Sequence, residues 1–128
     1  MRLPWWIAVA LAGALVAPSC QSGHTINGDV TLVVVAQANY FCSDVPGVVI
    51  KVYDEQEHLV RQVKSDKGRT VIQGTDVACK AAYSVDVPDS NFYRIQPEGG
   101  KSERLTKAEL EQSNWKVDLQ AEVSLENG

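Results

Sequence analysis

Several features that mark large functional classes are scarce or missing in this sequence. Lys and Arg account for 12 of 128 residues and stand singly among 16 acidic residues, which gives a formal net charge of −4. The concentrated positive charge with which proteins bind phosphate backbones is therefore absent, and we predict no nucleic acid partner. The uncharged run at residues 5–17 falls short of the roughly 20 residues of a membrane-spanning helix, so we expect that it does not span a membrane well.

Catalytic groups are also few. The sequence has two histidines, His24 and His58, and neither stands at motif spacing from a candidate nucleophile. No Gly-x-Ser-x-Gly motif occurs either. A nucleophile needs a base within hydrogen-bond reach and a group that orients that base. We therefore predict no enzyme, no catalytic residues and no cofactor, and we expect both histidines to be solvated.

Metal ligands are not grouped in a recognised pattern. A zinc site needs three or four Cys, His or carboxylate ligands, and the folded part of the chain does not supply them convincingly. Oxygen ligands gather at Asp86, Asp89 and Asn91, and again over residues 54–57. Neither group has the spacing of an EF-hand loop, so we predict solvated carboxylates in turns and no metal site.

The N-terminus has the composition of an export signal. Arg2 supplies a positive charge ahead of the uncharged residues 5–17, a length typical of a signal-peptide core. Ala17 and Ser19 are small, as signal peptidase requires before its cleavage point. We predict that residues 1–19 are a signal peptide.

The residue after this segment is Cys20. The sequence Ala17-Pro18-Ser19-Cys20 resembles a bacterial lipobox, in which the cysteine receives diacylglycerol and becomes the mature N-terminus, although its first three residues depart from the commonest choices. Two fatty acyl chains (palmitate) on Cys20 would make a stable membrane anchor, whereas one chain binds only marginally. The alternative is ordinary cleavage after Ser19, which leaves Cys20 as a thiol of a secreted protein.

The chain has three cysteines, and in an exported protein the one left over after disulfide pairing requires an explanation. Lipidation of Cys20 would leave Cys42 and Cys79, which we predict to form one disulfide. The bridge would close a long loop and contribute roughly 4 kcal/mol in the chain-entropy treatment. No Cys-x-x-Cys motif occurs, so this disulfide is predicted to be structural and not redox-active.

Alternating apolar and polar residues dominate the rest of the chain and indicate half-buried strands. The clearest run places Val77 and Cys79 on the same inward face as the apolar residues up to Val87. Thr106 and Glu109 form a capping box that predicts a helix of one or two turns, ending near Gln112. The expected strands are residues 25–36, 48–53, 59–64, 70–73, 77–87, 92–96 and 115–125.

These elements predict an all-β fold. Short strands with turn signals between them are typical of a β-sandwich, and we expect a single antiparallel β-sandwich of about seven strands with one short helix. Residues 20–24 would be the lipid anchor and a short tether, and residues 25–128 the sandwich domain.

Aromatic residues are the remaining candidates for a site. Tyr40 and Phe41 stand beside Cys42 in a long loop, where they could pack on the disulfide or form an exposed binding surface. Loops on a rigid sandwich often hold binding residues. Phe92 and Trp115 fall in strand patterns, and we expect them to fill the core.

Three segments of the chain resemble a group of small exported proteins and lipoproteins of actinobacteria and their phages. They are VPDSNFY at residues 87–93, LTKAELE at 105–111 and WKVDL at 115–119. The resemblance extends from about residue 28 to residue 119 and includes both internal cysteines. It implies an origin and a compartment but no chemistry. GVVIKVYD at residues 47–54 is more loosely similar to transthyretin-like, carboxypeptidase-regulatory sandwiches.

These observations predict a binding role outside the cytoplasm. The leading hypothesis is a lipoprotein anchored through Cys20 on the outer face of the cytoplasmic membrane, which acts as a non-catalytic interaction domain for an envelope protein or polymer. A second hypothesis is an inhibitor or a phage-encoded superinfection-exclusion factor. A third is a secreted soluble protein or a carbohydrate binder, or a weak hydrolase.

Overall fold

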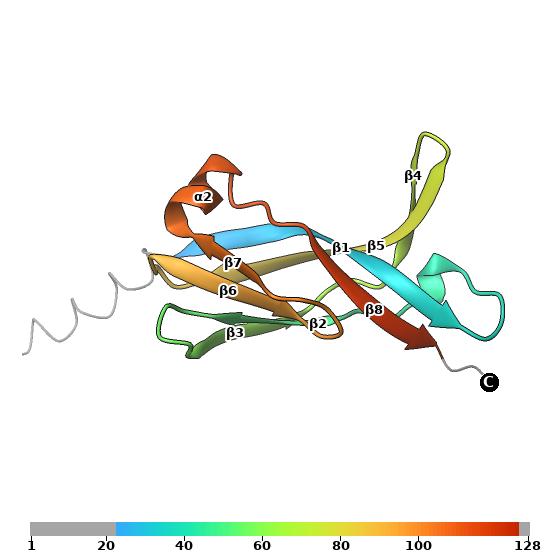
Figure 1. Cartoon of the computed structure of the whole chain (residues 1–128), viewed down its shortest axis with the longest axis horizontal. Helices are drawn as coiled ribbons and strands as arrows, with labels where there is room; N and C mark the ends of the chain where they lie inside the picture. Colours follow the sequence, from blue (N-terminus) through green and yellow to red (C-terminus); the bar gives the residue numbers. More distant parts are fainter. Residues whose placement is uncertain (1–22, 126–128) are drawn as a thin grey trace, which may run out of the picture.

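A computed structural model describes residues 23–125 of the protein. The predictions for residues 1–19 and for Cys20 lie outside the described residues. Within this range the chain forms eight strands, a single turn of 3₁₀ helix and one short α-helix (Figure 1). In chain order they are β1 (His24–Ala36), η1 (Cys42–Asp44), β2 (Val49–Tyr53), β3 (Leu59–Lys64), β4 (Arg69–Gln73), β5 (Asp76–Val87), β6 (Phe92–Pro97), β7 (Glu103–Thr106), α2 (Lys107–Gln112) and β8 (Leu119–Leu125).

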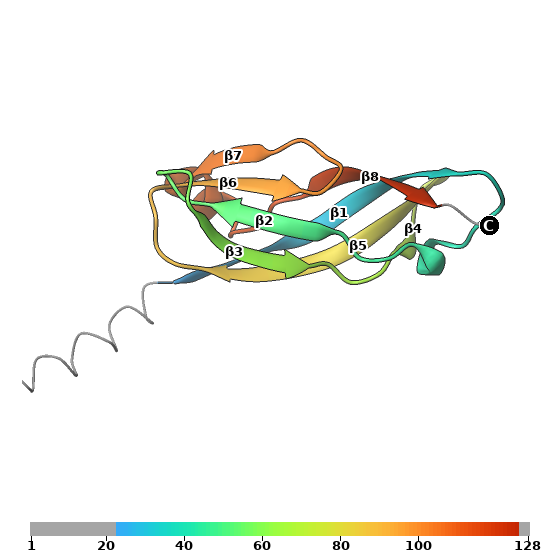
Figure 2. The same ribbon diagram turned by 90° about the horizontal axis from the view of Figure 1, so that it is seen from below.

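The strands form two four-stranded sheets that face each other (Figure 2). We call them sheet A, in the order β4-β5-β1-β8, and sheet B, in the order β3-β2-β6-β7. The predicted β-sandwich with one short helix is confirmed. Its strand pairs are antiparallel except for β1 with β8, which run parallel because the chain reaches β8 from the opposite sheet.

The core lies between the two sheets, where alternate side chains of each strand point inward. Ile26, Val30 and Tyr83 from sheet A face Ile50 and Ile95 from sheet B, and all are buried. The inward hydroxyl group of Tyr83 donates a hydrogen bond to the carbonyl of Val117 at 2.6 Å. Burial raises the pKa of this hydroxyl well above its ordinary value, so it stays protonated.

The helix prediction is confirmed at its first turn. Glu109 N–H donates to the Thr106 hydroxyl at 3.1 Å, and the Thr106 N–H donates to the Glu109 carboxylate at 2.9 Å. This reciprocal pair is the capping box, and α2 ends at Gln112 as expected. Within residues 23–125, no helix is both long enough and apolar enough to cross a membrane.

The last strand begins later than its sequence pattern predicts. Trp115 was expected to open this strand, but β8 starts at Leu119. Asn114 and Trp115 instead adopt left-handed backbone conformations after α2, with φ of 61° and 62°. The Trp115 N–H donates to the Leu110 carbonyl at 2.7 Å, which ties this turn to the end of the helix.

The turn between β6 and β7 closes one side of the sandwich against β8. Glu122 N–H donates to the Gly99 carbonyl at 2.9 Å. At the neighbouring Gly100 a β-carbon would lie 1.9 Å from the carbonyl oxygen of Gln120, so only glycine allows the backbones to approach this closely. The contact covers the free edge of β8 with backbone from the opposite sheet.

The molecule has two distinct ends. Strand β1 runs along its length, from the end where the described chain begins to the end that carries η1 and the hairpin of β4 and β5 (Figure 1). We call the first the proximal end and the second the distal end. Helix α2 and the turn between β2 and β3 lie at the proximal end (Figures 1 and 2).

Candidate binding site at the distal end

The loop between β1 and β2 is fixed to β5 by a disulfide. Cys42 and Cys79 are bonded, with their Cα atoms 5.3 Å apart, and the predicted pairing is confirmed. Asp44 closes the turn around Phe41: the carboxylate accepts from the Phe41 N–H at 3.1 Å, and the Asp44 N–H donates to the Phe41 carbonyl at 2.8 Å. The Gly68 N–H donates to the carbonyl of Val45 at 2.9 Å. The backbone that carries Phe41 is therefore held at several points.

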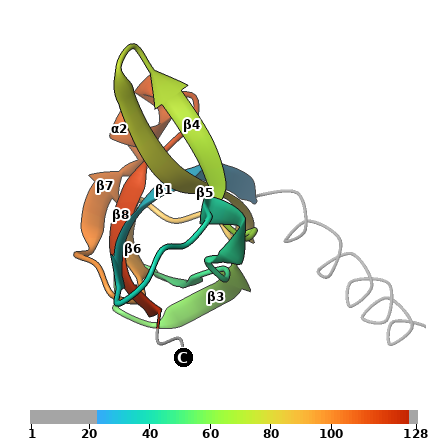
Figure 3. The same cartoon turned by 90° about the vertical axis from the view of Figure 1, so that its right-hand side faces the viewer.

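Strands β4 and β5 form a hairpin that projects beyond the rest of the sandwich (Figures 1 and 3). Gly74, in its two-residue turn, has φ of +64°, a conformation that glycine adopts without strain. Ile72 lies opposite Val77, and Thr70 lies opposite Cys79. Because side chains alternate along a strand, these four share one face of the hairpin, the face of the disulfide.

A hollow of about 410 Å³ separates the hairpin from the loop. Four large apolar side chains of the hairpin and the loop are exposed: Phe41 by 77%, Ile72 by 69%, Val77 by 67% and Tyr40 by 41%. We call these four the distal apolar cluster. Val33 and Val35 on β1 are exposed as well. The hollow is lined by Leu32, Tyr40, Phe41, Cys42, Thr70, Val77, Ala78 and Cys79.

The sequence left open whether Tyr40 and Phe41 pack inward or face solvent, and the structure shows both exposed. Val77 was predicted to point into the core, and this is wrong. Val77 lies on the predicted face of β5, but this part of the hairpin projects beyond the sandwich (Figure 1), and the side chain is 67% exposed. Ile72 was not singled out, although an apolar residue in so short a strand beside Gly74 was a usable signal.

Electrostatic support for the hairpin comes from its base. The Arg69 guanidinium lies 3.0 Å from the Asp29 carboxylate on β1 and donates a hydrogen bond to it. This pair spans the outer face of sheet A, because β5 lies between β4 and β1. The inner face of the hairpin carries Thr70 beside the apolar Ile72 and Val77.

The proximal end is organised differently. The His24 ring stacks on Trp115 with centroids 4.1 Å apart, and its Nε2 lies 3.0 Å from the Asp89 carboxylate. Lys107 Nζ lies 2.8 Å from the same carboxylate. The Lys107 hydrogen bond, followed by that of His24, lowers the pKa of Asp89. His24 was predicted to be a solvated part of the tether. It is instead a half-buried residue of β1.

The predicted clusters of turn carboxylates are bonded within the protein. Asp54 accepts from the backbone N–H groups of Gln56 and His58, both at 2.9 Å, and the His58 bond is the main cause of its lowered pKa. Glu57 binds Arg94 at 2.8 Å, which lowers the pKa of Glu57. Among residues 23–125, no three His, Cys, Asp or Glu side chains are grouped so that they could hold a metal ion.

Phe92 and Trp115, predicted to fill the core, are both half-buried at its margin. The Arg104 guanidinium lies 5.4 Å from the Phe92 ring centroid on the outer face of sheet B. Trp115 meets the buried Tyr93 edge to face, with centroids 6.1 Å apart. Trp115 thus seals the proximal end of the core.

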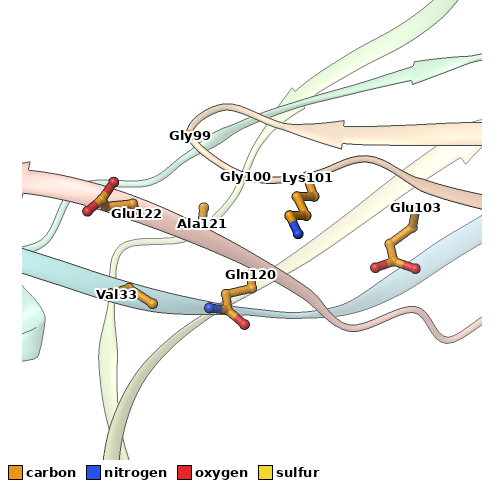
Figure 4. Close-up of a pocket in the computed structure, with 8 residues that line it drawn as sticks. All are labelled: Val33, Gly99, Gly100, Lys101, Glu103, Gln120, Ala121 and Glu122. Atoms are coloured by element: carbon orange, nitrogen blue, oxygen red, sulfur yellow. The ribbon is translucent and has the colours of Figure 1, made fainter.

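A second hollow, of about 460 Å³, lies where the β6–β7 turn meets β8 (Figure 4). Its polar side chains, Lys101, Glu103, Gln120 and Glu122, are all exposed. Carboxylates and an ammonium group of opposite sign stand together there, with no buried polar group directed into the hollow. The arrangement provides neither a nucleophile with its base nor a preference for one charge.

Comparison with known proteins adds no further assignment. No protein-family model matches this chain, and neither curated proteins nor solved structures give a match. The resemblances stated from the sequence therefore remain predictions. The structure itself supports a location outside the cytoplasm, because disulfides such as Cys42–Cys79 persist in oxidising compartments.

Proposed function

We propose that this protein is a non-catalytic binding domain of the cell envelope, anchored in the membrane through a lipid on Cys20. The observation that supports this most is the distal apolar cluster of Tyr40, Phe41, Ile72 and Val77. Exposed apolar side chains that gather in one place on a soluble domain mark interaction surfaces, whereas scattered ones need no explanation. Tyr40, Phe41 and Val77 line a hollow whose walls include the Cys42–Cys79 disulfide, and Ile72 lies opposite Val77 in the hairpin.

The orientation of β1 determines where such a surface would act. An anchor at Cys20 would hold the proximal end close to the lipid, since only three residues separate Cys20 from His24. A strand of 13 residues spans about 40 Å. The distal apolar cluster would then face away from the membrane, toward a protein or polymer of the envelope and not toward the lipid surface.

A site-specific crosslinking experiment tests the proposal. A photo-reactive benzoylphenylalanine replaces Phe41 in one strain and Leu59 in another, and both are irradiated in intact cells. Leu59 is a matched control, because it is an exposed apolar residue, 50% accessible, at the proximal end. We expect a defined partner to be captured at least about tenfold more strongly from position 41, in line with the concentration of binding energy in a few residues.

Equal capture of abundant neighbours from both positions would contradict the proposed binding role. The anchor is tested separately by the intact mass of protein purified from the membrane fraction without reductant. A diacylglyceryl group on Cys20 supports the anchored form. Recovery of an unmodified chain from the medium would contradict the anchor. The protein would then be a secreted binding protein with the same distal surface.

A further inference from the structure

We infer that the distal end binds an extended segment of its partner, which adds to sheet A as a new strand alongside β4. This inference rests on the proposed binding function and specifies the form of the bound partner. It depends on three features of the described residues: an open sheet edge at β4, a hollow beside that edge lined in part by apolar side chains, and the small size of the distal apolar cluster.

The edge of β4 differs from the three other sheet edges. β8 is covered by the β6–β7 turn through the hydrogen bond between Glu122 and Gly99. β7 has only four residues, and β3 carries Arg61 and Lys64. Short edges, covered edges and edges with charged residues are the devices by which proteins prevent unwanted strand pairing.

β4 is less protected than these edges, although η1 lies against its base. Its only charged residue, Arg69, is bound to Asp29 on the sheet face. The strand contains no proline and pairs with β5 in continuous register, without a bulge. Among residues 23–125, no backbone hydrogen bond connects β4 to any element other than β5. Every second residue of an edge strand turns its N–H and C=O groups away from its neighbour, so β4 offers free donors and acceptors.

The hollow gives this edge a means of recognising side chains. An added strand would place alternate side chains on the same face as Ile72 and Val77. That face borders the hollow between the hairpin and Phe41. The backbone of the added strand would supply affinity, and the hollow would select apolar side chains at alternate positions.

The size of the surface favours a short segment over a second folded copy of this protein. A stable interface between folded proteins uses about 20–30 residues on each side. The distal apolar cluster has four residues, and β4 has five. The walls are also fixed in advance, because the Cys42–Cys79 bond and the Asp44 turn hold the loop. Binding an extended peptide to such a preformed site orders only the peptide.

The test uses a displayed library of random twelve-residue peptides, selected on the immobilised oxidised protein. We expect enriched peptides to carry apolar residues at alternate positions. Binding of a synthetic copy should weaken about tenfold or more in the variant Ile72→Lys, which removes an apolar contact and places a charge on the edge. Leu59→Lys, on strand β3, is the matched control and should leave the affinity unchanged.

Backbone pairing is tested in the peptide itself. N-methylation removes an amide donor but keeps every side chain. Methylating the alternate amides that face β4 should abolish binding, whereas methylating the amides that face away from β4 should not. Equal effects of both methylations would overturn strand addition, as would an absence of alternation in the selected peptides. A dimer that is seen by sedimentation equilibrium and lost in Ile72→Lys would assign the edge to a second copy instead.

Failure of this inference is distinct from failure of the proposed function. A partner captured through position 41 that binds peptide-blocked and free protein equally well would keep the binding role and reject strand addition. Capture of no partner would reject both.

Discussion

At the proximal end Asp89 accepts hydrogen bonds from both His24 and Lys107, while at the distal end Phe41 and Ile72 stand exposed with apolar neighbours. The proximal end thus pairs its polar groups with one another and covers its core with Trp115. The distal end is held by the Cys42–Cys79 bond and the hydrogen bonds of the Asp44 turn, and it leaves its apolar surface to solvent. The contrast teaches that the two ends serve different purposes: one closes the fold, and the other presents a surface. Four predictions test this contrast.

The largest effect should come from the disulfide. Replacing Cys42 and Cys79 together with serine should lower the free energy of unfolding by roughly 4 kcal/mol, because the unfolded chain gains freedom that the bridge removes. Urea unfolding measures the loss. Amide hydrogen exchange should also increase more over residues 37–47 than over α2. An equal increase at both ends would mean that the bond acts only on the unfolded chain and does not hold the distal loop.

Alanine substitutions at two glycines, one in each half of the molecule, test how tightly the two ends are packed. In the proximal half of β1, a β-carbon at Gly28 would lie 2.1 Å from the Val117 carbonyl oxygen, and Gly28→Ala should cost about 3 kcal/mol. At the distal hairpin, a β-carbon at Gly74 would meet nothing within 4 Å, so Gly74→Ala should cost only about 1 kcal/mol, for its left-handed conformation. Similar losses in urea unfolding would contradict the contrast.

One aromatic residue from each end sharpens the comparison further. Trp115→Ala removes contacts with His24 and Tyr93 and should cost about 2 kcal/mol, less than a fully buried tryptophan would. Phe41→Ser removes a ring that is 77% exposed and should change the free energy of unfolding by less than about 0.5 kcal/mol. Thermal unfolding monitored by circular dichroism measures both. A large loss for Phe41→Ser would show that this ring supports the fold and is not free for binding.

The smallest effect should be a pH dependence confined to the proximal end. The hydrogen bonds from Lys107 and His24 lower the pKa of Asp89 below the ordinary value of 3.8. The stabilisation is therefore present above that pH and is lost as the pH falls through the lowered pKa of the folded state. Asp89→Asn should flatten the fall in Tm on acidification, and Lys107→Met should flatten it in part. An unchanged acid profile in Lys107→Met would show that this pair contributes nothing.

The sequence predicted the parts of the fold that depend on local pattern. Alternation located seven strands, and the Thr106–Glu109 capping box located α2, because hydrogen bonds and side-chain direction repeat over a few residues. Strand β7 was missed, since Glu103–Thr106 contains one apolar residue and becomes a strand only by pairing with β6. Trp115 was assigned to a strand because an aromatic residue beside an alternating run fits the pattern, while its left-handed turn depends on the end of α2.

The candidate site was only partly predictable, for a different reason. Alternation indicates which side of a strand Val77 faces, but not whether another sheet extends far enough to cover it. Tyr40 and Phe41 were identified by their place in a long loop. Ile72 joined them only through its register with Val77 across the hairpin. Whether a side chain is covered by the opposite sheet depends on how all the strands are arranged, and the pattern of residues along one strand does not show this.

The central position of β1 has a mechanical consequence. A partner that pulls on the distal end of a protein fixed through its N-terminus would load the molecule along β1, the strand that joins the two ends. Hydrogen bonds from β1 to β5 and β8 lie across that direction, so the load shears them together instead of opening them one after another. If the proposed anchor and binding surface are both present, the strand that separates them would also be the element that withstands tension between them.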